Sequence, residues 1–222
     1  MKKLHLGCGQ VYLDGYVNID YPRTEHTVQS ALVADEYCNI VELEYPVASI
    51  AEIRLHHVFE HFPRPVALAL LCRWSDWLPL GGTLRIETPD LMAAAKALAS
   101  PFVSYQKKQQ ITRHLFGSHE AVWAAHWDGW YAEKFRRILA KLGYIDIHCT
   151  CSRWYTLHNV DVTARRGSQL FSFEEYQKII SEILQESLIV SEQNKIADSE
   201  KAMHDVWMNT WRITYLRSKN DN

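Results

Sequence analysis

The sequence predicts an α/β fold, in which a mostly parallel sheet covered by helices is followed by a helical extension. Short strand-like runs alternate with helical patterns over most of the 222 residues. Glycine and proline punctuate this part, whereas neither occurs after Gly167. Strand–helix alternation is typical of parallel sheets, and a long stretch without either residue is typical of helices.

The predicted elements follow in chain order. Strands are expected over 3–6, 16–20, 31–35, 50–58, 83–88, 144–150 and 159–164, the last two as an antiparallel pair. Helices are expected over 65–78, 90–99 and 132–142, with Gly143 closing the third, and 100–130 is expected to be less regular. Only residues 10–16 separate the glycine pair Gly7 and Gly9 from the second strand. That crossover therefore has no room for a full helix.

The C-terminal part predicts two amphipathic helices. Ser172 and Glu175 have the spacing of a capping box, and apolar residues from Tyr176 to Leu188 follow a helical period. A second helix is expected over 202–216. The predicted organisation is therefore a domain over 1–166 and a helical extension over 167–222, packed on that domain or at a dimer interface.

Composition excludes several classes of protein. With 24 Lys+Arg against 26 Asp+Glu, a net charge of −2 offers no general attraction to nucleic acid or anionic membranes. No apolar run approaches the ~20 residues of a membrane span. The five cysteines are odd in number and scattered, which argues against a secreted disulfide framework. We expect a cytoplasmic protein, monomeric or homodimeric, with no membrane span and no nucleic-acid partner.

A glycine pair and two acids lie where a nucleotide site would form. Gly7 and Gly9 follow the first strand, and Asp20 and Asp35 end the second and third predicted strands. Ligands of open α/β sheets bind at such carboxyl ends, where a carboxylate can accept ribose hydroxyls or meet an adenine amino group. A single acid of this kind is more often a loop or cap residue, but a glycine turn and two acids at successive strand ends favour a binding site.

At this point the sequence resembles the class I S-adenosylmethionine-dependent methyltransferases. The closest likeness is to the methyltransferase-11-like group found among bacterial glycan- and polysaccharide-biosynthesis genes. The matching stretches, which cover most of residues 1–166, are KLHLGCGQVYLDGYVNID (3–20), LVAD (32–35), HHVFEHF (56–62), LPLGGTLRIETPDL (78–91) and AEKFRRILAKLGYIDI (132–147). The resemblance implies a Rossmann-like, seven-stranded, mostly parallel sheet with an antiparallel last strand.

The resemblance also implies a cofactor, S-adenosylmethionine, and its product, S-adenosylhomocysteine. Gly7, Cys8 and Gly9 would line the methionine and ribose portions, Asp20 with Tyr21 would hold the ribose, Asp35 would lie near the adenine, and His57 would close the pocket. Val11 stands where the family usually has a third glycine. The shortened first crossover occurs in the glycan-associated group.

His57 to His61 also fit a competing pattern, H-x-x-E-H, which occurs in zinc peptidases. That pattern needs a helix, so that both histidines share a face with Glu60 as the base. Pro63 and Pro65 follow at once and leave little helix around the histidines. The methyltransferase interpretation explains the same residues without a metal, so no metal ligand is predicted.

Methyl transfer to a hydroxyl usually needs a base, and histidine is the natural type. The candidates, in order, are His61, His126 in the segment WAAHWDGW (123–130), and Asp90 after the fifth strand. His61 is equally explained as a loop histidine, and His126 as part of an aromatic cluster. Trp123, Trp127 and Trp130 suit either a sugar-stacking surface or core filling.

The predicted function is methyl transfer to a small-molecule acceptor, a hydroxyl of a sugar or glycan precursor. The alternatives are a non-catalytic binding or interaction module of the same fold and, third, a zinc hydrolase.

Overall fold

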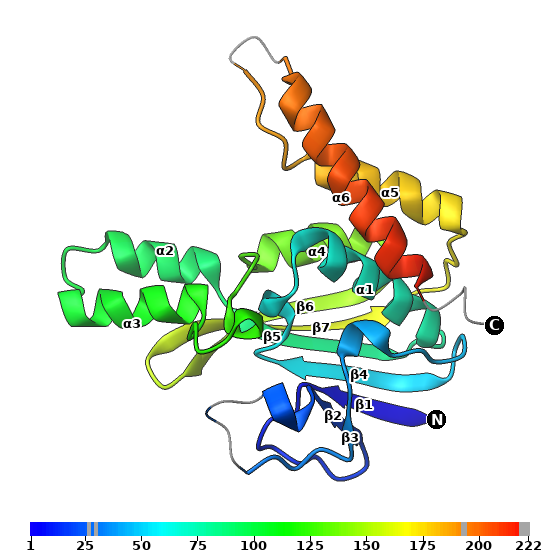
Figure 1. Cartoon of the computed structure of the whole chain (residues 1–222), viewed down its shortest axis with the longest axis horizontal. Helices are drawn as coiled ribbons and strands as arrows, with labels where there is room; N and C mark the ends of the chain where they lie inside the picture. The colour runs from blue at the N-terminus through cyan, green and yellow to red at the C-terminus, as the bar shows by residue number, and fades with distance from the viewer. Residues whose placement is uncertain (26–27, 29–30, 192–194, 218–222) are drawn as a thin grey trace.

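A computed structural model describes residues 1–25, 28, 31–191 and 195–217. Its strands form one seven-stranded sheet in the order β3-β2-β1-β4-β5-β7-β6 (Figure 1). They are β1 (Lys2–Leu6), β2 (Val17–Asp20), β3 (Glu36–Tyr37), β4 (Ile50–His56), β5 (Thr83–Pro89), β6 (Tyr144–Trp154) and β7 (Leu157–Arg166). β3, β2, β1, β4 and β5 run parallel, and β7 is antiparallel to both β5 and β6. The predicted fold class is confirmed.

The helices are α1 (Arg64–Trp77), α2 (Leu91–Ala99), α3 (Tyr105–Phe116), α4 (Ala132–Lys141), α5 (Phe173–Gln185) and α6 (Asp198–Leu216). All but α3 were predicted, to within a few residues at each end. Gly143 follows α4 with a φ of 77°, as a glycine that ends a helix does. Residues 7–16 form turns without a helix, as the short crossover required.

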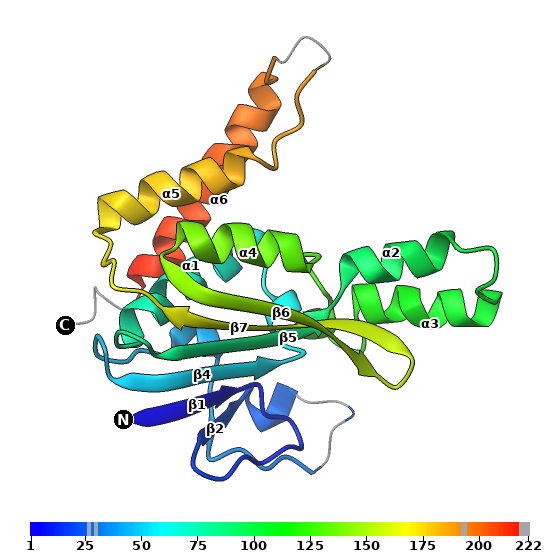
Figure 2. The same cartoon turned by 180° about the vertical axis from the view of Figure 1, so that it is seen from behind.

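The two faces of the sheet differ sharply. Apolar side chains such as Leu4, Leu55 and Ile86 alternate with polar ones along β1, β4 and β5, and they are buried together with α1, α4, α5 and α6. These four helices lie on one side of the sheet in both views (Figures 1 and 2). On the other face polar residues pair with one another: Arg85 Nη2 lies 2.6 Å from Asp161 Oδ2 on the neighbouring β7. These helices therefore cover one face of the sheet and not both.

The position predicted for the third strand is wrong. Residues 31–35 form no strand, and β3 consists of Glu36 and Tyr37 alone. Asp35 directly precedes β3. Its amide donates to Asn18 O at 2.7 Å, and its carboxylate accepts from the Asn18 amide at 2.8 Å. These bonds tie Asp35 to the beginning of β2, so it lies at the amino end of β3 and not at the carboxyl end.

The two C-terminal helices pack on α1. Ser172 and Glu175 form the predicted capping box at the start of α5. Tyr176 of α5 and Tyr215 of α6 direct their hydroxyls to the Asp76 carboxylate of α1, at 3.2 and 2.9 Å. Within the described part of the chain, no helix combines the length and apolarity that a bilayer crossing demands.

Candidate active site

A cavity of about 770 Å³ opens at the carboxyl ends of β1 and β4. The loop after β1, the segment after β4, the end of α3 and the β6–β7 hairpin surround it. Its lining includes Gly7–Val11, His56, His57, His61, His114, Trp123, His126 and Trp154. This volume lies in the range of ordinary small-molecule sites. The structure therefore brings the predicted glycine loop and the predicted histidines His57, His61 and His126 to one cavity.

Hydrogen bonds to β2 hold the glycine loop that follows β1. The Gly7 and Cys8 amides both donate to Ile19 O, at 2.8 and 3.1 Å. Gly7 has a φ of 69°, and a Cβ built on it would lie 2.1 Å from Val58 Cγ2. Burial, aided by the nearby Asp20 charge, raises the pKa of the Cys8 thiol to about 12. The loop is therefore a tightly fitted turn whose thiol stays protonated.

Asp20 fixes this turn from the end of β2. Its carboxylate accepts hydrogen bonds from the Gly9 amide and from the Tyr21 amide. The Asp20 side chain is buried, and neither Asp20 nor Tyr21 belongs to the cavity lining. Tyr21 reaches the cavity wall through Trp123, whose ring centroid lies 6.5 Å away. The ribose contact expected of Asp20 stays a prediction, and the structure adds a second task, that of shaping the loop.

Asp35 lies away from the cavity. It is exposed, and its Oδ2 accepts from the backbone and side-chain nitrogens of Asn18, at 2.8 and 3.1 Å. The backbone hydrogen bond, followed by the side-chain one, lowers its pKa. Since ligands of this sheet type bind at carboxyl strand ends, its position at the amino end of β3 removes the reason for expecting it beside an adenine.

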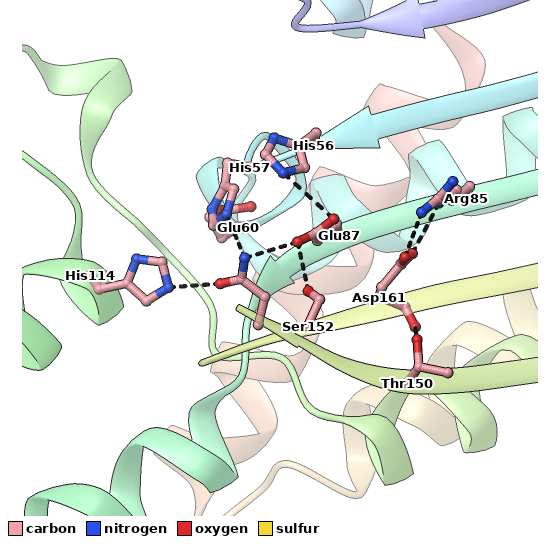
Figure 3. Close-up of polar contacts among 10 residues, drawn as sticks. His56, His57, Glu60, Arg85, Glu87, His114, Thr150, Ser152 and Asp161 are labelled. Carbon is pink, nitrogen blue, oxygen red and sulfur yellow. Dashed lines mark hydrogen bonds and ion pairs between the residues drawn. The ribbon is translucent and has the colours of Figure 1, made fainter. Parts of the chain in front are cut away.

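Beneath the cavity, Asn159 of β7 joins residues from three other elements. Its Nδ2 donates to Glu87 Oε1 and to His57 Nε2, both at 2.9 Å. Its Oδ1 accepts from His114 Nε2 at 2.8 Å. Figure 3 shows His57, from the segment just after β4, Glu87 of β5 and His114 of α3 converging on this network. Because Glu87 only accepts, the amide nitrogen faces it, and His57 Nε2 must then be the unprotonated nitrogen.

The same network sets the charge of Glu87. Hydrogen bonds from His56, Ser152 and Asn159 outweigh burial and hold the pKa of Glu87 well below its usual range. His57 uses its other nitrogen, Nδ1, to donate to Glu60 Oε1 at 3.2 Å. His57 is therefore fully engaged on both sides at the cavity floor.

His61 and His126 form a pair at the cavity wall, with ring centroids 4.7 Å apart. The Nδ1 of His61 donates to Ala125 O (3.3 Å), and the Nδ1 of His126 donates to Leu115 O (3.2 Å). Burial lowers the pKa of His126 to about 4, so that its ring is neutral at pH 7. The first two base candidates are thus neighbours, although 65 positions separate them along the chain.

Asp90, the third candidate, is the N-cap of α2. Its Oδ1 accepts from the Met92 and Ala93 amides, at 3.0 and 3.1 Å, and it does not line the cavity. An N-cap carboxylate of this kind holds the first turn of a helix. We therefore do not assign a base role to Asp90.

The helix that the zinc-peptidase pattern requires is absent from residues 56–62. His57 has a φ of 55°, and Phe59–His61 is a single 3-10 turn. Both nitrogens of His57 already have partners, so His57 and His61 cannot act together as the pattern demands. The geometry contradicts this ligand set.

The three tryptophans of the segment 123–130 have separate roles. Trp130 is 1% exposed and stacks on Phe135 in the core. Trp123 lines the cavity, and Trp127 is 58% exposed. Sequence reasoning did not find Trp154, which lines the cavity from the end of β6. Its only signal was an aromatic pair, Trp154 and Tyr155, at a predicted turn.

Comparison with solved structures identifies the fold. An S-adenosylmethionine-dependent methyltransferase from Archaeoglobus fulgidus is similar at a TM-score of 0.51 and 12% identity, over 74% of this chain and 85% of its own. An S-adenosylmethionine-dependent methyltransferase from Mesorhizobium loti is similar at a TM-score of 0.50 and 13% identity, over 74% of this chain and 90% of its own. A possible exported protein from Bordetella parapertussis is similar at a TM-score of 0.47 and 15% identity. The match covers 75% of this chain but only 63% of the Bordetella protein. The sequence matches no family model and no curated protein.

With the strand order above, these similarities show that the chain has the Rossmann-like fold of class I S-adenosylmethionine-dependent methyltransferases. The residues present also suit a nucleoside-type cofactor. A cavity large enough for a small molecule adjoins the glycine turn, and aromatic and polar side chains share its lining.

Proposed function

We propose that this chain transfers a methyl group from S-adenosylmethionine to a hydroxyl of a small acceptor, a sugar or glycan precursor. One observation carries the proposal. The glycine turn and the His61–His126 pair both line the cavity at the carboxyl edge of the sheet. This is the arrangement that a donor and an acceptor bound side by side would need.

In this proposal Gly7, Cys8 and Gly9 contact the cofactor, Asp20 and Tyr21 shape its ribose side, and His57 forms the floor. The bound cofactor supplies an electrophilic methyl group on a sulfonium. The protein's task is to align the acceptor oxygen with it and to exclude water. The Asn159 network supports this role, because it holds His57 in one orientation beneath the cavity.

The acceptor would lie between the histidine pair and the aromatic walls. The Trp123 and Trp154 side chains both line the cavity, and flat aromatic faces suit the apolar face of a sugar ring. His61 and His126 present unprotonated Nε2 atoms once their Nδ1 hydrogens are donated to carbonyl oxygens. Either atom can take the proton that the acceptor hydroxyl loses.

One observation favours the non-catalytic module instead. The Gly7, Cys8 and Gly9 amides are all hydrogen-bonded within the protein. The turn therefore offers fewer donors to a cofactor than its glycines suggested.

A transfer assay separates the two. The full chain is incubated with S-adenosylmethionine labelled in its methyl group and a panel of sugars and nucleotide sugars. We expect label in an acceptor, and loss of transfer in His61→Gln and His126→Gln. His148→Gln, on β6 outside the cavity lining, is the matched control. Cofactor binding without transfer to any hydroxyl acceptor would favour the module.

A further inference from the structure

Three side chains that could bind a metal ion lie close together, two of them, His61 and His126, in the cavity lining. Glu60, His61 and His126 each offer one oxygen or nitrogen, and these three atoms lie within 4.8 Å of one another. His126 Nε2 lies 4.0 Å from Glu60 Oε1. Because both histidines donate from Nδ1 to backbone carbonyls, their Nε2 atoms carry lone pairs. The lone pair on His126 Nε2 and the nearby Glu60 carboxylate repel each other unless a cation lies between them.

A second observation concerns the carboxylate itself. Glu60 is 1% exposed, and its Oε2 has no hydrogen-bond partner among the residues that the structure describes. A buried carboxylate oxygen without a partner is costly, and metal coordination is one way in which proteins satisfy it. The single hydrogen bond from His57 to Oε1 leaves this cost in place.

From these contacts we propose that Glu60, His61 and His126 bind a divalent transition-metal ion, with zinc the best fit. Two imidazoles and one carboxylate are a ligand set of catalytic zinc sites, whereas magnesium prefers oxygen ligands alone. Zinc lies about 2.0–2.2 Å from such ligands, so small rotations of the side chains would close the set. This site differs from the H-x-x-E-H pattern, because Glu60 is a ligand and His126 replaces His57.

The surrounding backbone already holds the ligands in register. The Trp127 amide donates to Glu60 O at 2.9 Å, and the His126 amide donates to Phe116 O at 3.1 Å. A metal-binding histidine typically donates its other ring N–H to a carbonyl or carboxylate, as His61 and His126 both do. The ligands therefore come from two distant segments that are joined before any ion binds.

The neighbouring group His56, His57 and Glu87 provides an internal comparison. Its atoms are equally close together. However, both His57 nitrogens are hydrogen-bonded, and Glu87 Oε1 accepts from Ser152 and Asn159, at 2.7 and 2.9 Å. The polar atoms of His57 and Glu87 thus already have hydrogen-bond partners within the protein. We therefore assign the ion to Glu60, His61 and His126 alone.

The proposed ion would have one further position to fill. His61 and His126 line the cavity, so a fourth ligand would come from the cavity as water or as an acceptor hydroxyl. With the ion bound, both Nε2 atoms would be its ligands, so a hydroxide formed from the water at the fourth position, rather than a histidine, would take the proton of an acceptor hydroxyl. Only the acceptor in this statement rests on the proposed function. The metal site stands on its own ligands.

Cobalt(II) tests the site, because its absorption spectrum reports the ligand set. The full chain is freed of metal with a chelator and titrated with cobalt and then with zinc. We expect one equivalent of cobalt with a tetrahedral spectrum, which zinc displaces. His126→Gln and His61→Gln should each weaken binding by more than the ~100-fold that loss of a supporting residue can cost. His148→Gln is the control and should bind as the wild type does.

Glu60→Gln gives a test that does not depend on destabilisation. The side-chain amide nitrogen of the new glutamine can donate to a histidine Nε2, where the glutamate carboxylate can only accept. The variant should therefore have a higher Tm than the metal-free wild type. Zinc should raise the Tm of the wild type and leave that of Glu60→Gln unchanged. Stoichiometric cobalt binding that survives both Glu60→Gln and His126→Gln, or no stoichiometric binding by the wild type, would overturn the proposal. Both readouts are independent of S-adenosylhomocysteine binding, so either proposal can fail alone.

Discussion

Gly7 is the residue on which the shape of the cavity depends most directly. Its φ of 69° and its contact with Val58 are separate constraints, one on the backbone and one on space. Gly15 shares the first constraint, with a φ of 80°, but has nothing within 4 Å of an added Cβ. The two glycines therefore allow the two constraints to be measured apart.

We expect Gly15→Ala to lower the free energy of unfolding by about 1–2 kcal/mol, the cost of a left-handed backbone for alanine. Gly7→Ala should cost clearly more, because its Cβ would also meet Val58 Cγ2 at 2.1 Å. Urea unfolding of both variants measures the difference. Equal losses would show that Val58 gives way without cost.

Glu87 links the stability of the fold to pH. Its pKa in the folded protein lies below the ordinary 4.5, chiefly through its hydrogen bond with His56 and then through Ser152 and Asn159. A carboxylate with a lowered pKa stabilises the fold above its ordinary pKa, and this contribution is lost as the pH falls toward the folded pKa. The stabilisation by Glu87 should therefore be complete at neutral pH and decline below about pH 4.5.

Glu87→Gln removes this contribution. We expect the variant to be less stable than the wild type at pH 7, and the gap to narrow as the pH falls below 4.5. Chemical unfolding at a series of pH values measures it, with the exposed Glu44→Gln as control. A gap that stays constant down to pH 3 would contradict the assignment.

At the scale of elements, α5 shows how a local signal can be sufficient. Ser172 Oγ accepts a hydrogen bond from the Glu175 amide at 3.2 Å, and Glu175 Oε2 accepts one from the Ser172 amide at 2.7 Å. This reciprocal cap needs only residues within one turn, so it could be predicted from sequence. The helix that it starts buries Tyr176 and Ile180 in the main core.

Ser172→Ala should lower the free energy of unfolding by about 1 kcal/mol, since it leaves helix amides without a partner. Ser168→Ala, at an exposed position before the helix, should have almost no effect. Thermal unfolding compares the two. A loss of equal size in both variants would mean that the cap adds nothing.

The elements that sequence reasoning missed have weak local signals. α3 buries only Ile111 and His114, so its apolar period is faint, although Ser104 caps its start and Gly117 follows its end. The two-residue β3 depends on bonds to β2 that no local pattern reports. Asn159 was missed as a site residue for a similar reason, and Glu60 was considered only as the base of the zinc-peptidase pattern. Their importance comes from partners on other elements, which bring His57, His114 and Glu87 to Asn159.

At the scale of the whole molecule, the helices gather on one face of the sheet. The strands signalled this by alternation, as in the run Thr83–Thr88, where Leu84 and Ile86 are buried and Arg85 and Glu87 point to the other face. Parallel sheets are usually covered on both faces. The alternation of buried and polar residues along these strands should have indicated that one face of this sheet is not covered by helices. The division into a domain over 1–166 and an extension over 167–222 remains a prediction. The contacts of α5 and α6 with α1 favour an extension packed on the domain.

The central claim is that the cavity beside the glycine turn binds S-adenosylmethionine. Isothermal titration calorimetry of the full chain with S-adenosylhomocysteine tests it most directly, performed once with a chelator and once with added zinc. The account predicts saturable binding at one site in both conditions, weakened in Gly7→Ala while Gly15→Ala retains it. Absence of binding by the correctly folded wild type in both conditions would contradict the account.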